Sequence, residues 1–142
     1  MYMKALYASL VAAGLLVVVG CNPSPTGGNP DEPGGTFKLK GPMNTPETTV
    51  KQGETVSKDI TVDAEKNFKE NIAFAVTVKP GDKGVTASVE PTTWKASESK
   101  EVKLLIKAGD KADMGEYTIH IEGTPAKGNP APCEVKIKVT AK

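Results

Sequence analysis

Apolar and polar residues alternate in short runs from Phe37 to the C-terminal region. In the clearest run, Ile72 to Val78, large apolar residues are separated by alanine or threonine. A repeat of two places successive side chains on opposite faces, which is typical of a β-strand with one buried face. Runs of this kind predict strands over residues 37–40, 48–52, 55–62, 72–78, 85–89, 102–107, 117–122 and 133–139.

Clusters of glycine, proline, asparagine and aspartate separate these runs, and no run has the 3.6-residue period of an amphipathic helix. The first two runs form one split strand, because Gly41-Pro42 interrupts it. The pattern thus predicts about seven antiparallel strands in about 105 residues. Since each strand has one apolar face, two sheets must pack around a shared core. We therefore expect an all-β antiparallel sandwich over residues 37–142.

The first twenty residues have a different pattern, in which one charge precedes an unbroken apolar stretch. Lys4 is followed by the 15 residues from Ala5 to Val19, and a helix that spans a bilayer needs about 20 apolar residues. A charged start, a short apolar centre and small residues at the end are typical of a secretory signal peptide. An uncleaved membrane anchor and an ordinary secretory signal are the alternatives.

The stretch ends in Val18-Val19-Gly20-Cys21, which resembles the lipobox of bacterial lipoproteins. The resemblance implies cleavage between Gly20 and Cys21 and attachment of diacylglycerol to the Cys21 thiol, with palmitate-type chains in the membrane. Two or three acyl chains, at about 0.8 kcal/mol per buried methylene, hold a protein more firmly than one myristoyl chain. The implied location is the bacterial cell envelope, and the choice between inner and outer membrane stays open.

Between the cysteine and the predicted sandwich, the chain has no aliphatic or aromatic residue. Residues 22–36 read NPSPTGGNPDEPGGT, and eight of these fifteen residues are proline or glycine. Such a segment buries too little apolar surface to offset the entropy lost on ordering. We therefore expect a disordered linker over residues 21–36 that spaces the domain up to about 45 Å from the membrane.

Composition and charge exclude several function classes. The 142 residues include 18 cationic residues, all lysine, and 17 acidic residues. Without a basic footprint or arginine, nucleic-acid binding is not expected. One histidine and two cysteines are too few for most metal cages and thiol relays, and the Gly-x-Ser-x-Gly motif is absent. We therefore expect no catalytic residue, no metal, no cofactor and no enzyme activity.

The most specific motif of the predicted domain runs from Asp113 to Ile119 and reads DMGEYTI. It resembles the Asp-x-Gly-x-Tyr-x-Cys turn and strand of immunoglobulin-like domains, with Ile119 in place of the cysteine. The resemblance implies a tyrosine corner, in which the Tyr117 hydroxyl bonds to upstream backbone after a turn that contains Asp113 and Gly115.

A second segment supports the same family. Val50-Lys51-Gln52-Gly53-Glu54 resembles the Val-x-Gln-Gly-Glu start of immunoglobulin-like modules in bacterial secreted and surface proteins. The chain departs from the family because it has no paired core cysteines and because Trp94 follows the fourth strand. The resemblance therefore implies an immunoglobulin-like sandwich but no particular function, since this fold has many functions.

Few side chains are candidates for binding. The alternation does not assign Trp94 and Phe68 to the core, so either could present an aromatic face to a sugar, although Trp94 could also close one end of the core. Cys133 shares the phase of buried residues and is expected to be inert, with cross-linking to a partner as the alternative. His120 is expected on the outer surface without a special role.

Two groups of loop carboxylates and one outer stripe complete the candidates. The carboxylates are expected to be solvated rather than to bind Ca²⁺, which needs six to eight oxygen ligands. The stripe is uncharged and is either a contact patch or a strand covered by a loop. The carboxylates are Asp63, Glu65 and Glu70 in one group and Asp110 and Asp113 in the other, and the stripe is Ala73, Ala75 and Thr77.

These observations predict an envelope lipoprotein that displays a non-catalytic immunoglobulin-like module. We expect the membrane to be contacted through the lipid on Cys21 and the module to bind an envelope protein. The alternative is a carbohydrate-binding accessory domain that recognises an envelope glycan. The sequence leaves the partner and the oligomeric state open.

Overall fold

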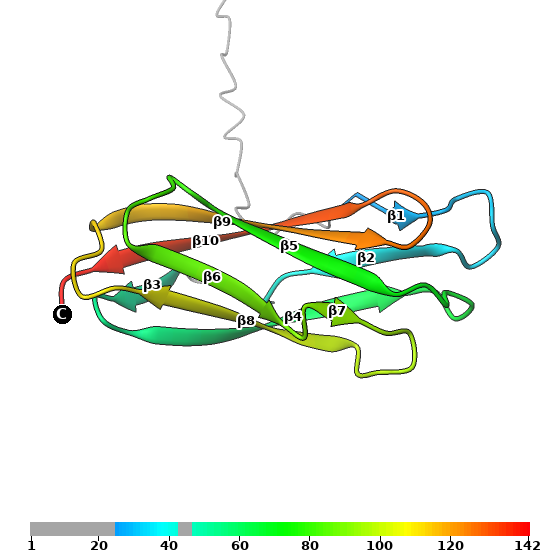
Figure 1. Cartoon of the computed structure of the whole chain (residues 1–142), viewed down its shortest axis with the longest axis horizontal. Helices are drawn as coiled ribbons and strands as arrows, with labels where there is room; N and C mark the ends of the chain where they lie inside the picture. The colour runs from blue at the N-terminus through cyan, green and yellow to red at the C-terminus, as the bar shows by residue number, and fades with distance from the viewer. Residues whose placement is uncertain (1–24, 43–46) are drawn as a thin grey trace, which may run out of the picture.

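The computed structural model describes residues 25–42 and 47–142. The regular secondary structure within these ranges consists of β-strands alone. Two five-stranded sheets, in the orders β1-β2-β4-β8-β6 and β3-β10-β9-β5-β7, lie face to face (Figure 1). The predicted all-β sandwich is confirmed. The strands are β1 (Gly27–Gly28), β2 (Thr36–Lys40), β3 (Thr48–Lys51), β4 (Thr55–Ala64), β5 (Ile72–Lys79), β6 (Val85–Glu90), β7 (Thr93–Trp94), β8 (Glu101–Ala108), β9 (Gly115–Pro125) and β10 (Ala131–Thr140).

The topology is immunoglobulin-like. The order β2-β4-β8-β6 faces β10-β9-β5, which matches the four strands against three of the constant-type domain. The two halves of the split first strand lie in different sheets, because β2 pairs antiparallel with β4 and β3 pairs parallel with β10. Gly41-Pro42 lies between these halves, at the position where the sequence predicted a break.

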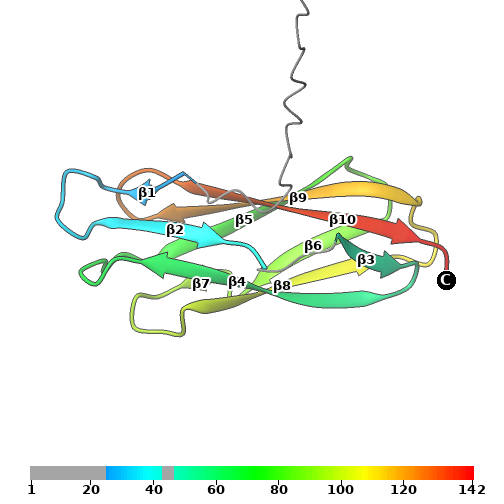
Figure 2. The ribbon, with the colours of Figure 1, turned by 180° about the vertical axis from the view of Figure 1, so that it is seen from behind.

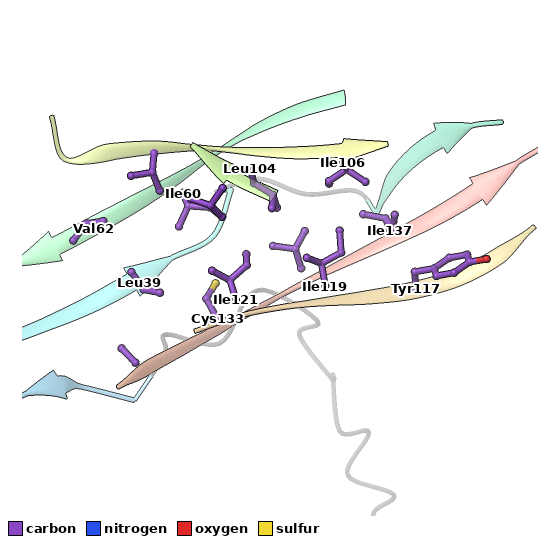
Figure 3. Packing of buried hydrophobic residues seen from close by; sticks show 14 of the residues in the cluster. Leu39, Ile60, Val62, Leu104, Ile106, Tyr117, Ile119, Ile121, Cys133 and Ile137 are labelled. Atoms are coloured by element: carbon purple, nitrogen blue, oxygen red, sulfur yellow. The ribbon is translucent and has the colours of Figure 1, made fainter. Parts of the chain in front are cut away.

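The core lies between the sheets and follows the alternation along each strand. Ile60 and Leu104 of one sheet, and Ile119 and Ile137 of the other, are fully buried, and Figure 3 shows these side chains facing one another. On the central strands the alternate residues are mostly exposed and polar, including several lysines. Each large aliphatic side chain buried in this way contributes about 1.5–3 kcal/mol.

The predicted disordered linker is wrong for residues 25–36. β1 pairs antiparallel with β2, and Figure 2 shows the two strands side by side. The Gly28 amide also donates to the carbonyl oxygen of Asn129 at 2.7 Å, and the Asn129 amide donates back to Gly28 at 2.8 Å. The folded domain therefore begins before Phe37.

The absence of side chains at Gly27 and Gly28 explains why this segment is ordered. A Cβ atom at Gly27 would lie 2.8 Å from the Phe37 ring and from the Ala131 Cβ. At Gly28, φ is +93°, a value that glycine adopts without the strain that a side chain brings. The low apolar content of residues 25–36 predicted disorder, yet Gly27 and Gly28 pack against their neighbours because they have no side chain.

Candidate functional site

The predicted lipidation site lies outside the described residues, because Gly20 and Cys21 precede residue 25. In the described ranges, no helix has the length and apolar character needed to cross a bilayer. Gly27, the first residue of β1, follows Cys21 by six positions. Six residues reach at most about 20 Å when fully extended, so the distance from position 21 to the folded domain is less than half of the spacing expected from the sequence.

The two aromatic candidates for sugar binding are buried. Trp94 is 3% exposed and Phe68 is 5% exposed. Their rings pack in a row with Phe37, with centroid distances of 5.2 Å for Phe37–Phe68 and 6.2 Å for Phe68–Trp94. The Trp94 indole N–H donates to the carbonyl oxygen of Ser99 at 2.7 Å, which satisfies the polar atom that would otherwise oppose burial.

The assignment of Trp94 and Phe68 as a candidate binding pair is therefore wrong for stacking on a sugar. Burial leaves neither ring an open face to present, and the pair instead closes one end of the core. The alternative prediction from the sequence, in which Trp94 closes one end of the core, agrees with its burial.

The tyrosine-corner residues lie at the start of β9. The Tyr117 hydroxyl donates to the carbonyl oxygen of Asp113 at 2.7 Å and lies 3.5 Å from the carbonyl oxygen of Lys83. The Asp113 carboxylate forms an ion pair with the Lys83 ammonium at 3.3 Å. Gly115 has a φ of +140°, a value that favours glycine. This arrangement joins the turn before β9 to the turn before β6 and is structural.

Burial has a direct effect on the Tyr117 side chain. Desolvation raises the pKa of the phenol, and the nearby Asp113 carboxylate raises it further, whereas Lys83 lowers it. The hydroxyl therefore keeps its proton and donates to Asp113 at neutral pH.

Cys133 and His120 lie where the alternation predicted. Cys133 on β10 is 3% exposed, so its thiol is not accessible to a partner. His120 on β9 faces outward, and its Nδ1 lies 3.4 Å from the Oε1 of Glu134 on β10. In the described part of the chain, neither side chain belongs to a group of three or more His, Cys, Asp or Glu residues that could hold a metal ion.

Most of the loop carboxylates pair with a lysine or accept a backbone N–H. Asp63 lies 2.6 Å from the Lys40 ammonium, and this hydrogen bond lowers the pKa of the Asp63 carboxyl. Asp110 pairs with Lys142 at 3.2 Å. Across residues 25–42 and 47–142, no three carboxylate, thiol or imidazole groups gather in a way that could hold a metal ion.

The outer stripe on β5 is exposed, as expected. Ala73, Ala75 and Thr77 face solvent, whereas the alternate residues Phe74 and Val78 are half-buried against the core. β5 pairs with β9 along its whole length but with β7 at Ile72 and Ala73 alone. The three stripe residues carry no charge, and no strand of the described ranges pairs with the outer edge of β5 beyond β7.

Sequence reasoning found the stripe but missed the open edge beside it. The order of strands in a sheet depends on contacts between distant segments, so alternation within β5 cannot show which side of it is unpaired. The one feature of the sequence that could have drawn attention to this edge is the run from Ile72 to Val78, which contains no charged residue.

Comparisons with known proteins support no assignment. No family model matches the chain, and no curated protein matches it. Domains 4 and 5 of the S-layer protein SbsC are similar in structure, with 18% identity over 72% of this chain and a TM-score of 0.47. The structure of rSbsC(31-844) has 20% identity over 68% of this chain and a TM-score of 0.43.

The matched regions are 50% of the first S-layer chain and 12% of the second. The protein therefore spans half or less of each of these chains. Similarity at this level does not assign a function to it.

Proposed function

We propose that this protein is a lipoprotein of the bacterial cell envelope and that its immunoglobulin-like domain is a non-catalytic module for protein interaction. The observation that carries the proposal is Val18-Val19-Gly20-Cys21, placed directly after a 15-residue apolar stretch. A thiol at this position can become a thioether to diacylglycerol, and the small Gly20 leaves room for a peptidase to cut beside it.

The short distance from Cys21 to β1 determines how the anchor would hold the domain. A lipid on Cys21 keeps β1 within about 20 Å of the membrane. β1 is hydrogen-bonded to β2 in one sheet and to Asn129 beside the other sheet. The anchor would therefore hold the whole sandwich close to the membrane surface rather than on a long stalk.

Protein interaction is favoured over glycan binding by the surface chemistry. The aromatic residues on which the glycan alternative depended, Trp94 and Phe68, are buried. The exposed stripe on β5 is small and uncharged, and such a surface suits contact with another polypeptide.

The anchor is tested by comparing the wild-type chain with Cys21→Ala and with Cys133→Ala, a change in the other thiol. Wild type and Cys133→Ala should fractionate with membranes, and their intact masses should match residues 21–142 plus acyl groups. Cys21→Ala should carry no acyl group and leave the membrane fraction. A wild-type chain without acyl groups contradicts the proposal, as does Cys21→Ala that stays membrane-bound to the same extent.

The interaction role is tested by a glycan-binding measurement on the membrane-anchored chain. The proposal expects no retention by isolated envelope polysaccharide beyond that of vesicles without the protein. Saturable retention would contradict a protein-binding role. Its survival in Trp94→Phe would place the glycan site away from the buried aromatic row, and its loss would place the site at that row.

A further inference from the structure

The outer edge of β5 has an unpaired segment. β7 covers the first part of this edge at Ile72 and Ala73, and the Phe74 amide donates to the carbonyl oxygen of Thr92 at 2.9 Å. In the described part of the chain, no strand pairs with β5 on this side beyond that point. Figure 1 shows β5 running on past β7 toward the opposite end of the sandwich.

The direction of the open backbone groups follows from the Phe74 bond. In an antiparallel strand, the N–H and C=O groups of one residue point to the same side, and every second residue repeats that direction. Because the Phe74 amide points away from β9, the main-chain groups of Val76 and Val78 also point away from it. This edge therefore presents two donors and two acceptors, spaced by two residues.

The side chains around these groups are unusual for an edge. Sheets normally protect open edges with charge, proline or bulges, yet the run from Ile72 to Val78 has no charged residue. The central strands carry the charge instead, including Lys103 and Lys107 on β8. On its inner face, β5 leaves Phe74, Val76 and Val78 half-buried, whereas the inward residues of β8 are buried.

On the opposite side of the sandwich, the sheet edge formed by β1 is covered. β1 has two residues, both glycine, and the main-chain groups of Gly28 that face away from β2 are bonded to Asn129. One side of the molecule therefore has a covered edge. β5 instead combines open backbone, an outer face that carries no charge before Lys79 and an incompletely buried inner face.

We infer that β5 pairs antiparallel with β5 of a second copy of this chain, about a two-fold axis that passes beside Thr77. Val76 lies opposite Val78 of the second copy, and Val78 lies opposite Val76 of the second copy. Each pair exchanges two N–H···O=C bonds, so the four open groups of each edge are all satisfied. This inference rests on the proposed interaction role and names a second copy as the partner.

A second copy fits because the edge is complementary to itself. The spacing of two between Val76 and Val78 lets one two-fold axis satisfy both residues at once. Thr77 then faces Thr77 of the second copy, a favourable cross-strand pair. Lys79 faces Ala75 of the second copy, so no like charges meet. Anchoring both copies in one membrane would also raise their effective concentration.

Disulfide trapping tests the register in the full-length chain in its membrane. At a non-hydrogen-bonded antiparallel pair the Cα atoms are about 4.5 Å apart, a distance that a disulfide accepts. Thr77→Cys should therefore give a covalent dimer on mild oxidation. The matched control is Ala73→Cys, which is also exposed on the outer face of β5 but would lie about 26 Å from its equivalent.

The inference expects about tenfold more disulfide dimer from Thr77→Cys than from Ala73→Cys. Equal yields, or no dimer from either variant, overturn it. A Thr77→Cys adduct that mass spectrometry assigns to a different protein also overturns it, since the partner would then not be a second copy. The wild-type chain provides the background from Cys21 and Cys133.

A charge variant tests the same pairing without cysteine. Thr77→Lys places two ammonium groups opposite each other, while Thr77→Ser keeps the hydroxyl; both changes are at an exposed side chain. Light scattering at high protein concentration, in the lowest detergent concentration that solubilises the chain, should give a dimer for wild type and Thr77→Ser, and a severalfold weaker dimer for Thr77→Lys. An unchanged dimer in Thr77→Lys overturns the register. If these tests fail while Cys21→Ala still abolishes anchoring, the lipoprotein proposal stands and the second copy does not.

Discussion

The two sides of this sandwich contrast in composition and in order. On the β1 side, a segment of proline and glycine packs against both sheets, and Gly28 bonds to Asn129. On the β5 side, a strand of apolar and β-branched residues keeps an open edge at Val76 and Val78. Apolar content therefore does not by itself indicate which edge of a sheet is closed. Backbone fit and hydrogen bonding close the first edge, and their absence among the described residues leaves the second one open.

The largest expected difference between the two sides is in packing. Phe37 lies on the closed side and is 1% exposed, whereas Phe74 lies on the open side and is half-buried. We expect Phe37→Ala to lower the free energy of unfolding by about 3–5 kcal/mol, and Phe74→Ala by roughly half as much. Denaturant titration of both variants measures this difference. Equal losses would show that β5 is packed as tightly as β2.

How far the sequence predicts the structure of these two sides depends on how far apart along the chain the interacting residues are. The alternation in β8 and β10 predicted both the strands and their buried faces, because it depends on neighbouring residues alone. The order of β1 depends on contacts with Asn129 and Ala131, about a hundred residues away along the chain. Amino-acid composition does not include such contacts, so the high proline and glycine content predicted disorder there.

The candidate site was predictable to a similar degree. The DMGEYTI motif predicted a hydrogen bond from Tyr117, and the structure has a bond to Asp113. The sequence did not predict whether Trp94 is buried. Its burial depends on a hydrogen bond from the indole N–H to the carbonyl oxygen of Ser99, which forms only in the folded chain. Edge position of β5 is likewise a property of the assembled sheets.

Backbone conformation should give the next largest effect. Gly28 has a φ of +93°, and an added Cβ would lie 2.1 Å from the carbonyl oxygen of Gly35. We expect Gly28→Ala to cost about 1–3 kcal/mol and to release β1. The matched control is Gly81→Ala, where an added Cβ has 3.7 Å of clearance. Thermal unfolding of the two variants should differ, and equal stability would contradict the account of β1.

A smaller effect is expected at the corner that joins the turns beside β6 and β9. Tyr117→Phe removes the hydroxyl that donates to Asp113, which should lower stability by about 1 kcal/mol. Burial raises the pKa of Tyr117 above its ordinary value of 10.0. The contribution of the protonated phenol to the free energy of unfolding is therefore fully present below pH 10 and is lost as the pH rises through the folded-state pKa.

The pH dependence separates the hydroxyl from the ring. The stability difference between wild type and Tyr117→Phe should shrink as denaturant titrations move from pH 8 to above about pH 10. A difference that is constant across this range would show that the hydroxyl proton contributes nothing.

The smallest effect should come from the exposed ion pair on the closed side. Asp63 pairs with Lys40, and the pairing lowers the pKa of Asp63 from 3.8. Its stabilisation is present above that pH and is lost as the pH falls through the folded-state pKa. Because both side chains are well exposed, Asp63→Asn should cost less than about 1 kcal/mol at neutral pH. Acid titration of both proteins should show a weaker pH dependence in the variant.

Amide hydrogen exchange of the membrane-anchored chain tests the contrast between the two sides most directly. If β5 pairs with a second copy, the amides of Val76 and Val78 should exchange slowly in the native membrane and rapidly when copies are dispersed in excess detergent. The Gly28 amide, bonded to Asn129 within one copy, should exchange slowly in both states. Rapid exchange at Val76 and Val78 in the membrane as well as in detergent would contradict pairing at the open edge.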